Sequence, residues 1–263
     1  MKNVLTLGNS DTTGASGIQG DIKTICAHGT YGMSIITSVV ACSTTKVFSI
    51  VNLDADIIKD QMEAVFQDIR VDAVKLGLMC SVETIMAVSE KLRKYKPEII
   101  VVDPVMVAKT GELFVTKDVI ECLKQEIFPM ATIVTPNLKE AEMLSEMSIT
   151  TPDEVKEACI KIKKFGSEYV LVKCGNIEFE PIDVLYDGSQ FWRYESMRIN
   201  TKNTGGAGST LACSIAANLA VGGDVPQSVS LAKKYIAVAI DQHLDLGSGY
   251  GTLNHFYKFF RKR

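Results

Sequence analysis

A glycine-rich segment at residues 203–210 contains the residue types that most directly suggest chemistry. It reads Asn-Thr-Gly-Gly-Ala-Gly-Ser-Thr and leads into small, mostly apolar residues with helical spacing. Glycines at the start of a helix let unpaired backbone N–H groups converge, and the positive end of the helix dipole also attracts anions. The alternative is a loop that needs glycine only for close helix packing, and the segment alone does not decide between the two. The candidate anion-binding residues are Gly206, Ala207, Gly208 and Ser209.

A second glycine-rich segment, residues 8–21, follows the first apolar run of the chain and opens a helical pattern. Its glycine spacing does not match the dinucleotide pattern G-x-G-x-x-G. Its place between a strand and a helix is nevertheless where open α/β sheets bind ligands. Asp21 falls in the first turns of that helix, where an acid either faces a ligand or only compensates the helix dipole.

The third segment, residues 134–142, places Asn137 and Glu140 three positions apart at the start of a helix that follows a strand. Oxygen ligands with this spacing suit a hydrated Mg²⁺ beside nucleotide phosphates. The alternative is an ordinary helix start, with Asn137 as the cap and Glu140 in the first turn. Three such segments at strand-to-helix transitions of one sheet are better explained by one ligand site than by three coincidences.

Short apolar runs alternate with longer amphipathic segments, which is typical of repeated βαβ units. Buried strands of a parallel sheet are expected at residues 4–7, 34–40, 73–76, 99–102, 133–134 and 169–172. Helices are expected at residues 55–69, 82–95, 153–165, 207–221 and 227–241. Two further runs around Asp187-Gly188 predict a β-hairpin and therefore a mixed sheet edge. The pattern predicts an α/β fold with a largely parallel central sheet.

Composition excludes several classes of protein. The chain has 263 residues, and 28 Lys+Arg against 31 Asp+Glu give a net charge of −3, which argues against a nucleic-acid binder. Apolar residues make up 46% of the chain, enough for a sizeable core, and a single domain spanning residues 1–263 is expected. No apolar run approaches the ~18 residues of a membrane span, and no signal-peptide core is present. We therefore expect a cytoplasmic protein with no membrane contact, and free thiols at its seven cysteines.

Seven motifs, taken together, extend the evidence beyond these three segments. They are residues 10–11 with 17–21, 31–33, 71–79, 103–109, 135–140, 183–187 and 203–208. In these motifs the chain resembles the hydroxymethylpyrimidine and phosphomethylpyrimidine kinase branch of the ribokinase superfamily, which also contains bacterial pyridoxal kinases. The resemblance runs from residue 4 to about residue 256. It implies a ribokinase-like three-layer α/β/α fold.

The resemblance also implies a reaction. ATP, with Mg²⁺, would phosphorylate the hydroxymethyl group of a pyrimidine, either hydroxymethylpyrimidine or its monophosphate in thiamine biosynthesis. The partner is then a small pyrimidine or pyridine alcohol, and relatives are commonly homodimers. Residues matching the anion hole are Gly206, Ala207, Gly208 and Ser209; those matching the nucleotide side are Lys173, Asn137 and Glu140, the last two organising Mg²⁺ through water. Residues matching the substrate pocket are Asn9, Asp21, Cys42, Met79 and Val105.

Two departures from the family pattern leave alternatives open. Ser209 stands where relatives have an Asp or Cys base, and a hydroxyl ionises far less readily, so the resemblance implies reduced rather than absent turnover. Cys42 stands where pyrimidine kinases usually present a Gln to the aminopyrimidine edge. A pyridoxal or pyridoxine kinase of vitamin B6 salvage and a catalytically weakened ligand-binding relative are therefore the alternatives.

Overall fold

The computed structural model describes residues 1–107, 113–175, 182–195 and 199–259. Its strands are β1 (Asn3–Asp11), β2 (Tyr31–Cys42), β3 (Val47–Asn52), β4 (Ala73–Leu76), β5 (Ile100–Val102), β6 (Ile133–Val134), β7 (Tyr169–Val172), β8 (Ile182–Tyr186) and β9 (Phe191–Glu195). Its helices are α1 (Gly17–Ala27), α2 (Ala55–Asp68), α3 (Val82–Tyr95), α4 (Lys117–Glu126), α5 (Leu138–Ser145), α6 (Pro152–Lys163), α7 (Ala207–Ala220) and α8 (Val225–Asp241), with a short 3₁₀ turn at Phe128–Met130.

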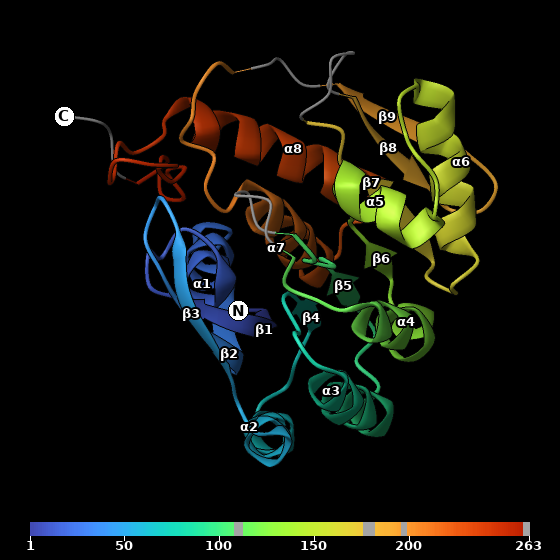
Figure 1. Cartoon of the computed structure of the whole chain (residues 1–263). Helices are drawn as coiled ribbons and strands as arrows, with labels where there is room; N and C mark the ends of the chain where they lie inside the picture. The colour runs from blue at the N-terminus through green and yellow to red at the C-terminus, as the bar shows by residue number, and fades with distance from the viewer. Residues whose placement is uncertain (108–112, 176–181, 196–198, 260–263) are drawn as a thin grey trace.

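All nine of these strands form one sheet in the order β3-β2-β1-β4-β5-β6-β7-β8-β9 (Figure 1). The six neighbouring strands β2, β1, β4, β5, β6 and β7 pair in parallel. Strand β8 pairs antiparallel with both β7 and β9, as the predicted hairpin required. The predicted α/β fold with a largely parallel sheet and a mixed edge is therefore confirmed. The opposite edge is antiparallel as well, because β3 turns back along β2. The sequence analysis missed β3, since five of its six residues are exposed and the strand has no buried face to detect.

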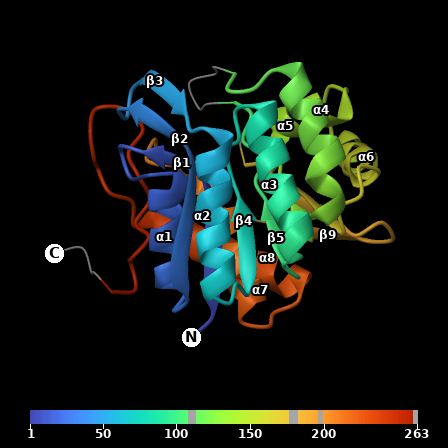
Figure 2. The same ribbon diagram turned by 90° about the horizontal axis from the view of Figure 1, so that it is seen from below.

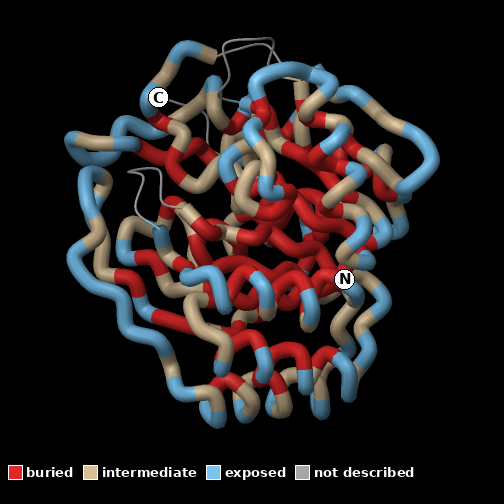
Figure 3. The backbone as a smooth tube through the Cα atoms, turned by 45° about the vertical axis from the view of Figure 1, so that its right-hand side comes forward, coloured by how far each residue is buried: buried red, intermediate tan, exposed pale blue. Residues whose placement is uncertain are grey.

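Helices cover both faces of the sheet, which confirms the three-layer α/β/α architecture. Helices α2 to α6 lie on one face, and α1, α7 and α8 lie on the other (Figures 1 and 2). Buried residues concentrate in the sheet and on the inner sides of the helices (Figure 3). Successive side chains of a strand point to opposite faces, so Val74 and Leu76 of β4 pack toward α2 and α3. Ala73 packs on the other face, and the alternation places Lys75 there with it, beneath α1 and α7.

The described part of the chain holds no helix long and apolar enough to cross a membrane. All seven cysteines are free, as the sequence analysis expected.

Candidate active site

A cavity opens at the carboxyl ends of the parallel strands, beside the start of α7. It brings together the three segments that the sequence analysis selected, although they are far apart in the chain. The predicted site residues that line it are Asn9, Asp21, Cys42, Val105, Asn137, Glu140, Lys173, Gly206, Ala207, Gly208 and Ser209. Met79 is the exception: its side chain is buried in the hydrophobic core, and its neighbour Leu78 lines the cavity instead.

The start of α7 owes its shape to glycine. Gly206 caps the helix with φ +78°, in the left-handed region that favours glycine. A Cβ atom at this position would lie 1.8 Å from the carbonyl oxygen of Ala15, so any side chain would force the first loop away. A Cβ at Gly208 would lie 3.3 Å from the Lys173 Nζ atom, which shows how closely the helix start approaches that ammonium group. Close packing therefore explains the glycines, and the same packing leaves the helix start facing the cavity.

Asn137 and Glu140 form a capping box at the start of α5. The Asn137 side chain accepts the Glu140 N–H at 3.0 Å, and the Glu140 carboxylate accepts the Asn137 N–H at 2.8 Å. The other Glu140 oxygen accepts the Met106 N–H at 3.2 Å. Asn137 and Glu140 therefore do cap the helix, as the ordinary helix-start interpretation expects, and both residues also line the cavity.

The charge state of Glu140 is set by its surroundings. Burial raises the pKa of Glu140 to about 7; the positive charge of Lys173 opposes this rise, and the negative charge of Asp103 adds to it. Lys173 pairs directly with Asp103 at 2.6 Å, and the Thr135 hydroxyl donates to the same Asp103 oxygen at 3.4 Å. Lys173, Asp103 and Glu140 therefore form one charge cluster where β5, β6 and β7 end, and we call it the Asp103 cluster.

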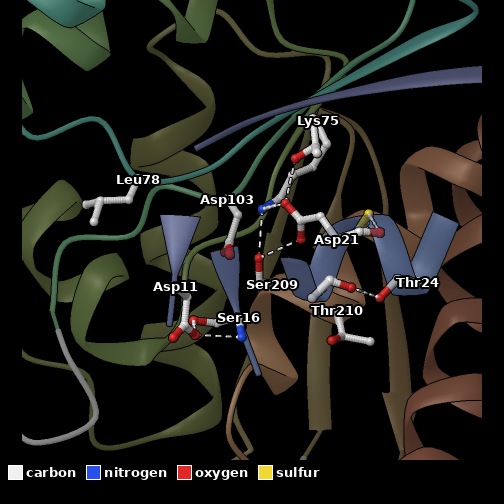
Figure 4. Close-up of polar contacts among 12 residues, drawn as sticks. Asp11, Ser16, Asp21, Thr24, Lys75, Leu78, Asp103, Ser209 and Thr210 are labelled. Atoms are coloured by element: carbon white, nitrogen blue, oxygen red, sulfur yellow. Dashed lines mark hydrogen bonds and ion pairs between the residues drawn. The ribbon is translucent and has the colours of Figure 1, made fainter. Parts of the chain in front are cut away.

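A second cluster lies deeper, under the start of α7 (Figure 4). The Lys75 ammonium donates to Asp21 Oδ2 at 2.8 Å and to Ser209 Oγ at 2.7 Å. The Ser209 hydroxyl donates to Asp21 Oδ1 at 2.9 Å, and the Thr6 hydroxyl donates to Asp21 Oδ2 at 2.5 Å. We call Thr6, Asp21, Lys75 and Ser209 the Asp21 cluster. The cluster joins β1, α1, β4 and α7. It shows that Asp21, whose role the sequence left open, is held by buried polar partners.

The sequence analysis did not single out Lys75, although it lines the cavity. The available signal was a lysine inside the apolar strand β4, where a charge is rare without a partner. Burial lowers the pKa of Lys75, but the negative charges of Asp21 and Asp103 outweigh burial and raise it overall. Lys75 is therefore an ammonium ion at neutral pH.

Cys42 lines the cavity at the end of β2, and its thiol donates to Asp11 Oδ1 at 3.1 Å. Burial and the Asp11 carboxylate raise the pKa of this thiol, so it is uncharged at neutral pH. Asp11, which the sequence analysis also missed, organises the first loop by accepting the N–H and hydroxyl groups of Thr13 and Ser16. Its place in the second glycine-rich segment was the available signal.

This fold and this cavity are those of a ribokinase-like kinase. Residues 11–254 match the phosphomethylpyrimidine kinase family, and the chain belongs to that family. The resemblance carried by the sequence motifs is thereby confirmed.

Relatives in this family share most of the chain. The hydroxymethylpyrimidine/phosphomethylpyrimidine kinase of Rhizobium meliloti is 39% identical over 261 residues, which cover 98% of this chain and 98% of the relative. A thiamine biosynthesis bifunctional protein of Geobacter sulfurreducens is 42% identical over 96% of this chain, which spans about half (52%) of that longer protein. Among solved structures, an ADP complex of Bacillus subtilis pyridoxal kinase is similar with a TM-score of 0.91 and 33% identity, covering 97% of each chain.

Proposed function

We propose that the protein transfers the γ-phosphoryl group of ATP to the hydroxymethyl group of hydroxymethylpyrimidine or its monophosphate, in thiamine biosynthesis. The observation that supports this most directly is one cavity with two chemically different sides. Lys173 of the Asp103 cluster presents a positive charge, and the start of α7 presents backbone N–H groups, both suited to phosphates. The other side presents apolar and hydrogen-bonding groups suited to a ring, including Leu78, Val105 and Cys42.

The nucleotide would bind with its phosphates between Lys173 and the start of α7. In-line phosphoryl transfer depends on positioning and on neutralising the charge of the phosphates, and these two groups supply both. Gly206, Ala207, Gly208 and Ser209 begin the helix at this point. On the ring side we assign Asn9, Cys42 and Val105 to substrate contact. Asp21 acts only through the Asp21 cluster because its side chain is 1% exposed, and we leave Met79 out because its side chain is buried in the core.

Mg²⁺ would reach the site with the nucleotide phosphates. The described residues contain no group of three or more His, Cys, Asp or Glu side chains that could hold a metal ion by themselves. Mg²⁺ usually keeps several waters and needs only one or two carboxylates beside phosphates, so this donor set suits it. Asn137 and Glu140 would contact its waters, since each Glu140 oxygen keeps a lone pair beyond the N–H bond it already accepts.

The partner of the chain is proposed to be a second copy of itself. Strand β3 is an open sheet edge, and it exposes Phe48, Ile50 and Val51, with Val39 of β2 beside them. An exposed apolar edge strand can pair with a strand of another molecule.

We further propose that the whole chain works as one kinase domain in the cytoplasm, where seven free thiols are expected.

A pyridoxal kinase is the second candidate function. The similarity to a pyridoxal kinase over 97% of the chain favours it, as does Cys42, which offers a thiol where an amide would recognise an aminopyrimidine. A catalytically weakened ligand-binding protein is the third, and only Ser209 and Cys42 favour it.

One assay separates these functions. The purified protein with Mg²⁺ and ATP is offered hydroxymethylpyrimidine, its monophosphate, pyridoxal and pyridoxine side by side, and phosphorylated products are detected by mass spectrometry. We expect product from the two pyrimidines. Product only from pyridoxal and pyridoxine would support the second function, and product from none of the four would contradict both kinase functions.

A further inference from the structure

The Ser209 hydroxyl has a fixed place in the Asp21 cluster. It donates its proton to Asp21 at 2.9 Å and accepts a hydrogen bond from Lys75 at 2.7 Å. A hydroxyl has one proton and two lone pairs, so one lone pair of Ser209 remains unused within the cluster. Ser209 lines the cavity at the start of α7, where the transferring phosphoryl group would lie. The unused lone pair is therefore available to a substrate hydroxyl.

We propose that Ser209 and Asp21 form a proton relay for the kinase reaction, and that Lys75 is the positioning residue that orients Ser209 for it. This inference rests on the proposed function. A bond forms between the substrate oxygen and the γ-phosphorus, and the bond from that phosphorus to the β,γ-bridging oxygen breaks, leaving its electron pair on ADP. The substrate hydroxyl gives its proton to Ser209 Oγ as Ser209 passes its own proton to Asp21 Oδ1. One proton thus moves from substrate to carboxylate.

The direction of the relay follows from the chemistry of Lys75. An ammonium group can only donate hydrogen bonds, so Lys75 cannot receive the Ser209 proton, which must point to Asp21. The side chains of Lys75 and Asp21 are each 1% exposed, so bulk water does not compete for either group. The orientation of the Ser209 hydroxyl is therefore built into the fold.

The relay explains how a serine can serve at a position where a hydroxyl alone is a poor base. In a loose phosphoryl-transfer transition state the substrate oxygen becomes acidic late, once it is bonding to phosphorus. A carboxylate already paired with an ammonium group then suffices as the final acceptor. Asp21 needs Ser209 to reach the substrate, because the Asp21 side chain is 1% exposed whereas Ser209 is only partly buried at the start of α7.

The test is a double-mutant cycle on turnover. One change is Ser209→Ala, and the other is the pair Asp21→Asn with Lys75→Met, which removes both charges and leaves no unpaired buried ion. Each change should lower kcat about 100-fold and leave the KM for ATP within about threefold. The combined variant should fall no more than about threefold further, because parts of one relay fail together.

Two further variants separate the relay from a packing role. Ser209→Cys keeps a proton to pass on and should recover most of the turnover that Ser209→Ala loses. The control pair is Glu63→Gln with Lys91→Met, which removes a 2.6 Å ion pair between α2 and α3. That control should change the melting temperature but not kcat.

Several results would overturn the relay. Effects that multiply in the combined variant, or wild-type turnover in Ser209→Ala, would show that the groups act independently or not at all. If the Asp21/Lys75 pair variant does not fold, the Ser209 variants decide, and equal turnover of Ala and Cys contradicts the relay. A wild-type protein that phosphorylates no pyrimidine or pyridine alcohol would overturn the proposed function together with the relay, whereas multiplying effects in an active protein overturn the relay alone.

Discussion

The cavity contains two lysine–carboxylate pairs that differ in how completely the fold encloses them. In the Asp21 cluster, the Lys75–Asp21 pair is 2.8 Å long and each side chain is 1% exposed. In the Asp103 cluster, the Lys173–Asp103 distance is 2.6 Å, and the Lys173 side chain is 11% exposed. A sealed pair can hold one hydrogen-bond geometry, whereas a partly open lysine can still approach an anion that enters the cavity. This difference in enclosure supports our proposal that the Lys75–Asp21 pair serves proton transfer and the Lys173–Asp103 pair serves phosphate binding.

Gly206→Ala should produce the largest effect, because the start of α7 contacts both clusters. Ser209 belongs to the Asp21 cluster, and Gly208 lies beside Lys173 of the Asp103 cluster. The new Cβ would collide with the Ala15 carbonyl and also strain a left-handed backbone, so we expect more than ~2 kcal/mol of lost stability. Displaced N–H donors should lower kcat about 100-fold or more. Thermal melting and steady-state kinetics measure the two effects.

The control for this change is Gly222→Ala. Gly222 also has a positive φ, +100°, but no atom lies within 4 Å of the Cβ position. It should lose only the strain energy, about 1–2 kcal/mol, and keep its turnover. Equal turnover in the two variants would contradict the assigned role of the α7 start.

Asn137→Ala and Glu140→Ala should affect the Asp103 side alone. We expect the apparent affinity for Mg²⁺ to drop about 10- to 100-fold, because groups that hold metal-bound waters have effects of this size. A magnesium titration of the initial rate measures this apparent affinity.

Thr151→Ala is the matched control, because Thr151 and Glu154 form the same kind of capping box at the start of α6. It should lose a similar ~1 kcal/mol of helix stability without any change in magnesium dependence. Unchanged rates across the magnesium titration in both site variants would show that Asn137 and Glu140 act only as helix caps.

Cys42→Gln tests the ring side. An amide at this position should restore a hydrogen-bonding edge for an aminopyrimidine, and an unsatisfied polar edge costs about 1–3 kcal/mol. The ratio of kcat/KM for hydroxymethylpyrimidine over pyridoxal should therefore rise about tenfold. An unchanged ratio would mean that the Cys42 side chain does not face the bound ring.

Glu140→Gln should change how stability depends on pH. The folded pKa of Glu140, about 7, lies above the value of 4.5 for an unperturbed glutamate. The folded state therefore holds the proton more tightly, and the free energy of unfolding should fall as pH rises from about 4.5 to about 7. The Gln variant cannot titrate, so the stability of wild type relative to the variant should decrease by on the order of 1–3 kcal/mol across this window. Parallel pH curves from denaturant unfolding would show that Glu140 does not hold this proton.

The sequence predicted the six parallel strands, the hairpin edge and the three segments around the cavity, because hydrophobic periodicity and glycine placement are local signals. The sequence could not predict the hydrogen bonds and ion pairs between these segments. Whether Asp21 compensates a helix dipole or meets a partner depends on Lys75 and Ser209, which are distant in the chain and adjacent only in the folded sheet. The burial of the Met79 side chain in the core could not be predicted for the same reason, since the side to which a residue turns after a strand ends is set by tertiary packing. The exposed edge strand β3 gave no periodic signal at all.

The division of work between the two clusters is tested most directly by calorimetric binding of a non-hydrolysable ATP analogue. Two variants are compared with wild type: Lys173→Met, and Asp21→Asn combined with Lys75→Met. We predict that Lys173→Met weakens binding about 10- to 100-fold, since it removes a charge-assisted contact to phosphate. The Asp21/Lys75 variant should bind within about threefold of wild type although its kcat falls about 100-fold. Equal weakening in both variants, or weakening only in the Asp21/Lys75 variant, would contradict the division.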